Sequence, residues 1–180
     1  MAEVYISVDI ESAGPIPGKY SMLALGACEV GKTNQSFYIE IRPINESFVP
    51  EAMEIVGRPL SDFDERGEEA DEAVKKFRDW IKAISGERTP VFIGFNATFD
   101  WSFVNWYFQT YLNDNPFGFG GVDIKSFYMG LTGCSWKETR SSRIPDKFKG
   151  PTAHTHNALD DAIEQAEMFE RMRKVAANSI

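Results

Sequence analysis

Acidic residues stand at the ends of apolar stretches in three separate parts of the chain. Asp9 and Glu11 close the first stretch, Asp100 follows another by a few residues, and Asp161 lies in a helical segment near the C-terminus. Carboxylates beside apolar segments are costly unless they have a partner. Oxygen donors of this kind suit Mg²⁺ or Mn²⁺, so the four residues predict a shared divalent metal site.

The spacing within the first pair supports a shared ligand. Asp9 and Glu11 are two residues apart on a predicted strand, so both carboxylates face the same side. Each group has an ordinary reading when it is taken alone. An Asp-x-Glu pair is usually a strand edge in water, Asp100 could simply favour a helix dipole, and His156 could cap a helix. Only when these acidic residues and the histidine are taken together do they predict a catalytic site.

Length and composition predict one globular domain, residues 1–180. The chain is 43% hydrophobic and 13% aromatic, and no apolar run approaches the ~20 residues that cross a bilayer. Residues 1–3 lead directly into strand-like sequence without a basic start, which indicates no secretory signal and a cytoplasmic protein. Cys28 and Cys134 are therefore expected to be reduced.

The net charge of −8 is unusual for a protein that binds nucleic acid. Much of the excess lies in residues 62–72, where seven acidic residues and one arginine give −6 and indicate a solvated loop and helix start. Residues 137–149 carry five basic and two acidic residues, a net of +3. That segment is a candidate for gripping a phosphate backbone, although a solvated loop is an equally good reading.

The hydrophobic pattern predicts strands first and then alternating helices and strands. This order indicates an α/β sheet flanked by helices, with three antiparallel strands in a meander at its start. The expected strands are 4–10, 22–30, 36–41 and 90–95, and the expected helices are 50–56, 69–84, 97–112, 123–131 and 157–175, with 132–155 mostly loop.

Three short sequence motifs occur in an order that is typical of one enzyme family. They are Asp9-Ile10-Glu11 on the first strand, Asn96-Ala97-Thr98-Phe99-Asp100 after a later strand, and His156-Asn157-Ala158-Leu159-Asp160-Asp161 at the last helix. The chain thereby resembles the DEDDh 3′–5′ exonucleases. The resemblance implies a ribonuclease H-like mixed sheet, with three antiparallel strands followed by parallel strands, flanked by helices.

The resemblance also implies a role for each motif residue. Asp9, Glu11, Asp100 and Asp161 would hold two divalent metal ions, Mg²⁺ or Mn²⁺, and His156 would be the general base. Further residues would contact or support the substrate. These are Ser12, Ala13, Asn96, Phe99, Phe103, Lys147 and Lys149.

Two positions leave an alternative. His154 lies two residues before His156, but only His156 has the family's five-residue offset to Asp161. Asp160 is adjacent to Asp161, and a helix turns about 100° per residue, so the two cannot share a face. The family offset selects Asp161.

The substrate implied by the resemblance is the 3′ end of a single-stranded nucleic acid. Single-stranded DNA is slightly favoured. An exoribonuclease that trims RNA ends is the alternative, and a proofreading subunit that acts with a polymerase is another. A homodimer is also open. Recognition of RNA would require a contact to the 2′-hydroxyl, which backbone groups can supply without any sequence signature.

Overall fold

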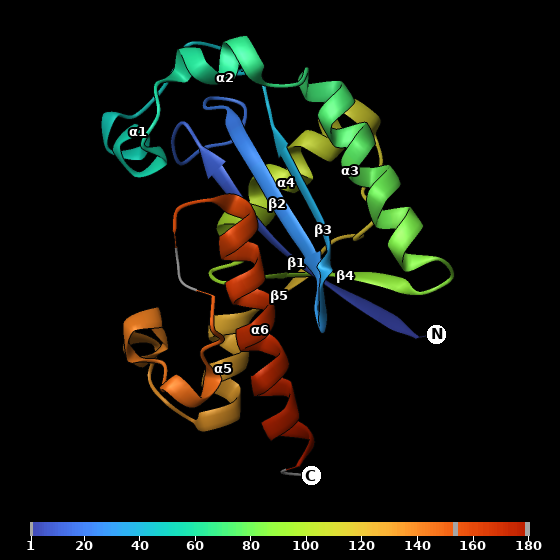
Figure 1. Ribbon diagram of the computed structural model, residues 1–180, viewed down its shortest axis with the longest axis vertical. Coiled ribbons are helices and arrows are strands. Elements are labelled where there is room, and N and C mark those ends of the chain that lie inside the picture. The colour runs from blue at the N-terminus through green and yellow to red at the C-terminus, as the bar shows by residue number, and fades with distance from the viewer. Residues whose placement is uncertain (1, 153–154, 179–180) are drawn as a thin grey trace.

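A five-stranded mixed sheet forms the centre of the molecule in a computed structural model that describes residues 2–152 and 155–178 (Figure 1). The strand order is β3-β2-β1-β4-β5. β1 (Glu3–Ser12), β2 (Met22–Glu29) and β3 (Lys32–Glu40) are antiparallel, while β4 (Thr89–Gly94) and β5 (Gly121–Asp123) continue the sheet in parallel with β1. The predicted mixed sheet is therefore confirmed.

Helices cover both faces of this sheet. They are α1 (Pro50–Val56), α2 (Leu60–Arg66), α3 (Ala70–Ser85), α4 (Thr98–Leu112), α5 (Ile124–Thr132) and α6 (Ala158–Ala177), with 3₁₀ turns η1 (Trp136–Thr139), η2 (Ser141–Arg143) and η3 (Asp146–Phe148) before α6. In Figure 1, α6 crosses in front of the sheet, and α4 lies behind it. Two large hydrophobic cores result, one under α3 and α4 and the other under α5 and α6, and a smaller third cluster contains Ala13, Leu23 and Phe63.

The alternation of β1 decides which side chains reach which core. Val4, Ile6, Val8 and Ile10 are buried in the core under α3 and α4. The odd-numbered residues point to the opposite face because side chains alternate along a strand. Tyr5 accordingly packs into the core beneath α6. Two further odd positions, 9 and 11, carry carboxylates instead of apolar groups and lie near the first turn of that helix.

The structure differs from the predicted elements in four places. β3 begins at Lys32, so the turn between β2 and β3 is shorter than expected. Helix α2 occupies part of the acidic run that was predicted to be a loop, and Phe63 anchors it as its one buried side chain. The three-residue β5 was missed because it follows directly on glycines. Three short 3₁₀ turns replace the predicted loop at 132–155.

Among the residues described, no helix is both long enough and apolar enough to cross a membrane. Cys28 is buried in β2, Cys134 is half-buried, and both are free thiols, as predicted.

Candidate active site

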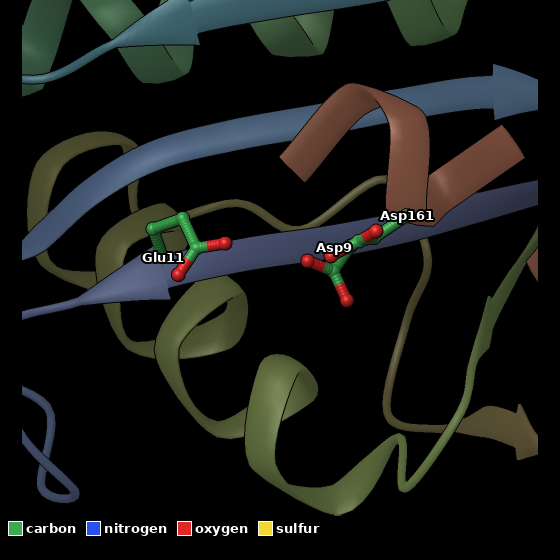
Figure 2. A group of neighbouring side chains, drawn as sticks. All are labelled: Asp9, Glu11 and Asp161. Atoms are coloured by element: carbon green, nitrogen blue, oxygen red, sulfur yellow. The ribbon is translucent and has the colours of Figure 1, made fainter. Parts of the chain in front are cut away.

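Three of the predicted carboxylates meet where β1 approaches the first turn of α6. One carboxylate oxygen each of Asp9, Glu11 and Asp161 lies within 4.8 Å of the other two. Figure 2 shows Asp9 and Glu11 on β1, with Asp161 reaching toward Asp9 from α6. The strand shifts register against β2 between Glu11 and Ser12, so an irregularity ends the regular pairing beside the site. Three oxygen donors at this spacing could hold a divalent metal ion.

Asp100 lies beside this cluster but outside the group of three. Its side chain is buried, and Oδ1 accepts a hydrogen bond of 3.2 Å from the backbone N–H of Ile10. This bond joins the start of α4 to β1 between Asp9 and Glu11. Asp100 thus approaches the site from the opposite face of the sheet.

A cleft of about 400 Å³ opens over these residues. Several residues predicted to act at the site line it. They are Asp9, Glu11, Ser12, Asn96, Phe99, Asp100, His156 and Asp161. Apolar side chains, among them Pro15, Ile55 of α1 and Phe99 of α4, form a further wall of the cleft, and Glu51 of α1 also lines it. The cleft therefore combines an acidic floor with an apolar wall, which suits a ligand with a charged group and a planar ring.

Burial raises the pKa values of three carboxyls at the site, those of Asp9, Glu11 and Asp100. Burial raises the pKa of Asp9 well above its usual value, and the nearby charges of Asp100, Glu11 and Asp161 add to the shift. Burial, with repulsion from Asp161 and Asp100, raises the pKa of Glu11 to about 8. Burial also raises the pKa of Asp100 to about 7. Carboxyls held together at this cost are typical of a site completed by a cation.

The first turn of α6 is placed by a cap and by a glycine. The side chain of Asn157 accepts hydrogen bonds from the backbone N–H groups of Leu159 and Asp160, at 3.0 and 3.3 Å, and begins the helix. Gly26 lies opposite Asp9 on β2, and a Cβ atom there would lie 2.2 Å from the carbonyl carbon of Ala158. Only glycine allows the helix to come this close to the sheet.

The residues just before α6 hold the two adjacent aspartates in different directions. The backbone N–H of Thr155 donates to Oδ1 of Asp161 at 2.9 Å, and its hydroxyl donates to Oδ2 of Asp160 at 3.0 Å. Asp161 belongs to the carboxylate cluster with Asp9. His156 has a backbone φ of 58°, a conformation that is uncommon outside glycine, and its side chain lines the cleft.

Sequence reasoning missed Gln165, which lies one turn after Asp161 on α6. Its side-chain amide donates to Oδ1 of Asp9 at 2.6 Å, and its Oε1 accepts from the backbone N–H of Phe95 at 2.9 Å. Gln165 is 7% exposed. Its spacing of four residues from Asp161 places both on one helix face, and this was the only signal in the sequence.

Asp123 was also missed as a site residue, because it is the last residue of the unpredicted strand β5. Its Oδ1 accepts from the backbone N–H of Ala97 at 3.0 Å, and its Oδ2 accepts from the backbone N–H of Ser126 at 2.8 Å. It therefore ties the entrance of α4 to that of α5. The charge of Asp123 contributes to the raised pKa of Asp100.

Four residues predicted to contact substrate do not line the cleft. Phe103 is fully buried and packs beside Phe99, so its side chain belongs to the core. The backbone groups of Ala13 are engaged with neighbouring loops, since its N–H donates to the Ser21 carbonyl and its carbonyl accepts from Val49. The burial of Phe103 agrees with a core residue, and a contact between Ala13 and substrate stays a prediction.

The two lysines lie on the η3 turn. Lys147 stacks on the ring of Phe148, with Nζ 4.9 Å from the ring centre, and Lys149 pairs with Asp146 at 3.0 Å. Neither lines the cleft, and contact of these two lysines with the substrate strand stays a prediction. His154, the alternative base, lies outside the described residues.

The mixed sheet, with an acidic cluster at the end of its first strand, agrees with the DEDDh type of 3′–5′ exonuclease that the sequence motifs predicted. A family described as the 3′–5′ exoribonuclease Rv2179c-like domain matches residues 4–172. The chain belongs to this family. It is also 47% identical over 175 residues to the 3′–5′ DNA exonuclease Cap18 of Escherichia coli, which covers 97% of this chain and 94% of that protein.

Solved structures share the fold at low sequence identity. The nuclease domain of 3′hExo, a DEDDh family member bound to rAMP, superposes with a TM-score of 0.77 at 17% identity, covering 96% of this chain and 92% of that one. Exonuclease I of E. coli in complex with a dT13 oligonucleotide gives a TM-score of 0.74 at 12% identity. That match covers 98% of this chain but only 42% of the exonuclease.

Proposed function

We propose that this chain hydrolyses single-stranded DNA from its 3′ end with divalent metal ions and releases nucleoside 5′-monophosphates. We further propose that residues 1–180 act as one catalytic domain. The observation that carries the proposal is the cluster of Asp9, Glu11 and Asp161, whose ligand oxygens lie within 4.8 Å of one another on the floor of the cleft. The position of Asp100 beside this cluster supports a four-carboxylate site.

The donor set fits two Mg²⁺ or Mn²⁺ ions. Each acidic side chain offers hard oxygen ligands, and burial together with mutual repulsion raises the pKa values of Asp9 and Glu11, an effect that bound cations would offset. Asp9, Glu11 and Asp161 would hold the ions directly, with Asp100 as a ligand or a water-mediated partner. Bound ions would supply an activated water and would stabilise charge on the attacking and leaving oxygens.

His156 is our candidate for the general base. It lines the same cleft as the carboxylates, and histidine is the side chain that most often serves as a general base in catalysis. The deprotonated water would form a new bond to phosphorus, while the bond from phosphorus to the 3′-oxygen of the preceding nucleotide breaks. That 3′-oxygen takes up a proton and becomes the new 3′ end, and the released nucleotide keeps the phosphate.

The terminal nucleotide would lie against the apolar wall of the cleft. Phe99 and Ile55 line this wall, and the terminal base could pack against them. Ser12 and Asn96 would contact or order the sugar side of the nucleotide, since both line the cleft next to the carboxylates. Asn96 has a φ of 66°, so its peptide adopts an uncommon turn at the cleft edge.

DNA is proposed because the relative that matches nearly the whole chain at 47% identity is named a DNA exonuclease. RNA is the second candidate, because the matching family is described as an exoribonuclease. The two are separated by digesting end-labelled DNA and RNA of identical sequence with Mg²⁺ and comparing kcat/KM. Higher kcat/KM on DNA is the expected result, and higher kcat/KM on RNA would assign the chain to the second candidate.

A further inference from the structure

A second hollow adjoins the active-site cleft on its far side. It has a volume of about 170 Å³ and is lined by Asp9, Phe95, Ser141, Glu164, Gln165 and Met168. Asp9 and Phe95 also line the larger cleft, so the two hollows meet at the carboxylates. A strand cut at this point needs room on both sides of the scissile phosphate. The larger cleft can take the terminal nucleotide, and the smaller hollow leads toward the η2 turn.

An exposed aromatic ring and a lysine lie beyond this second hollow. Nζ of Lys125, near the start of α5, is 4.1 Å from the ring centre of Trp136 and 6.0 Å from that of Phe95. Phe95 belongs to both hollows, so Lys125 connects the active site to Trp136. Trp136 begins the η1 turn and remains 51% exposed.

The η1 turn is held firmly enough to present this ring. The hydroxyl of Ser135 donates to the carboxylate of Glu138 at 3.0 Å, and the backbone N–H of Ser135 donates to the same oxygen at 3.0 Å. The buried Thr139 donates back to the carbonyl of Trp136 at 2.8 Å. These bonds fix the backbone of the turn from which the exposed side chain of Trp136 projects.

The charge around Trp136 complements a nucleic acid. Lys137, Arg140 and Arg143 are exposed on the η1 and η2 turns, within a chain whose net charge is −8. Basic residues are thus concentrated beside the exposed ring and next to the smaller hollow. Aromatic rings flanked by cations bind single strands, because bases stack on the ring while cations neutralise phosphates.

We propose that Trp136 and Lys125 form a binding platform for the strand on the 5′ side of the scissile phosphate. This inference rests on the proposed exonuclease function and names a second part of its substrate site. A base of the remaining strand stacks on the exposed ring of Trp136, and the ammonium group of Lys125 lies against the adjoining phosphate. The platform holds the strand that stays bound, not the nucleotide that is released.

The test compares a long substrate with one that cannot reach the platform. The long substrate is a dT oligonucleotide of ten residues, and the short one is the p-nitrophenyl ester of thymidine 5′-monophosphate. Trp136→Ala should raise the KM for the oligonucleotide about tenfold, as expected for the loss of one stacked base. It should leave kcat/KM on the short ester unchanged. Trp136→Phe, which keeps a stacking ring, should restore most of the affinity.

Binding measured in EDTA gives a readout that does not depend on hydrolysis. Lys125→Gln should weaken binding of a fluorescent dT oligonucleotide and should reduce the slope of log affinity against log salt by about 0.7. Phe119→Ala and Lys82→Gln are matched controls. Phe119 is fully exposed before β5, Lys82 is exposed on α3, and neither lines the two hollows.

The outcomes separate the platform from the proposed function. An unchanged oligonucleotide KM in Trp136→Ala, with a Tm equal to wild type, would overturn the platform while leaving the exonuclease intact. Equal losses on the oligonucleotide and the short ester would also overturn it, since they would indicate a damaged active site. Wild-type protein that hydrolyses neither substrate would contradict the proposed function itself.

Discussion

The side-chain amide of Gln165 donates a hydrogen bond of 2.6 Å to Oδ1 of Asp9. The other end of the same side chain accepts from the backbone N–H of Phe95, so Gln165 joins β1, the end of β4 and α6. These elements carry or adjoin the three sequence motifs. This bond therefore restrains the orientation of the Asp9 carboxylate within the cluster.

Replacing Gln165 with leucine should therefore weaken metal binding and catalysis together. A residue that hydrogen-bonds to a metal ligand typically contributes about 10–100-fold to metal affinity or activity, and we expect a loss in that range. Calorimetric titration with Mn²⁺ measures the first effect, and kcat measures the second. Gln109→Leu, on the exposed part of α4, is the control. A folded Gln165→Leu protein with wild-type Mn²⁺ affinity would show that the bond to Asp9 is not needed.

His156→Ala should reduce kcat about 10²–10⁴-fold, because the attacking water would lose its base. The matched control is His154→Ala, two residues earlier, for which we expect a small effect. Single-turnover rates on end-labelled DNA measure both. A larger loss in His154→Ala than in His156→Ala would reverse the assignment of the base.

Gly26→Ala should impair activity from a position outside the cleft. The new methyl group would meet the backbone of Ala158 at 2.2 Å, so the first turn of α6 would have to move away from the sheet. Overpacking of this kind typically costs 1–3 kcal/mol of stability. Because that turn carries Asp161, displacement by about 1 Å should lower kcat by up to ~10²-fold.

The control for Gly26→Ala is Gly120→Ala, where an added Cβ would meet nothing within 4 Å. Tm from thermal unfolding and kcat from digestion of labelled DNA are measured for both variants. Wild-type kcat in Gly26→Ala would mean that α6 does not need this close approach.

The metal-free protein should lose stability as the pH rises from about 4 to 8. Glu11 and Asp100 have pKa values of about 8 and 7 in the folded state, above those of ordinary carboxyl groups. The folded chain therefore binds more protons than the unfolded chain across this range, and their contribution to stability is lost as pH passes through the folded pKa values. Mg²⁺ should restore stability near pH 8, because it binds only the folded state.

Thermal unfolding in EDTA at several pH values measures this effect. Glu11→Gln removes one titrating group, so its Tm should fall less between pH 5 and pH 8 than the wild-type Tm. Glu54→Gln, on the exposed side of α1, should follow the wild-type curve. If Tm depends on pH in the same way in wild type and Glu11→Gln, the pKa of Glu11 is not raised in the folded protein.

The sequence predicted the clustered acidic residues because motif spacing and strand alternation are local properties. Asp9 and Glu11 share a face for a reason that is visible in two residues. Gln165 and Gly26 could not be found in this way. Their roles depend on how closely α6 lies against β1 and β2, which are more than 100 residues away in sequence.

Phe103, Lys147 and Lys149 show the same limit, because local sequence does not specify which way a side chain points. Phe103 follows Phe99 by one helical turn, so the two were predicted to act alike, yet Phe99 lines the cleft and Phe103 is buried. Lys147 and Lys149 contribute to a basic segment, but the 3₁₀ turns direct them to Phe148 and Asp146. The direction of each side chain depends on tertiary packing, which the charge and periodicity of the sequence do not specify.

The central claim is that the carboxylate cluster is a metal-dependent site for cutting nucleotides from a 3′ end. The most direct measurement is digestion of a 5′-labelled single-stranded DNA with Mg²⁺, by wild type and Asp161→Asn. We predict a ladder that shortens from the 3′ end with release of mononucleotides, no products in EDTA, and at least a 100-fold slower reaction in Asp161→Asn, on the order expected when a metal ligand is lost. Cleavage of a circular single strand, or equal rates in wild type and Asp161→Asn, would contradict the claim.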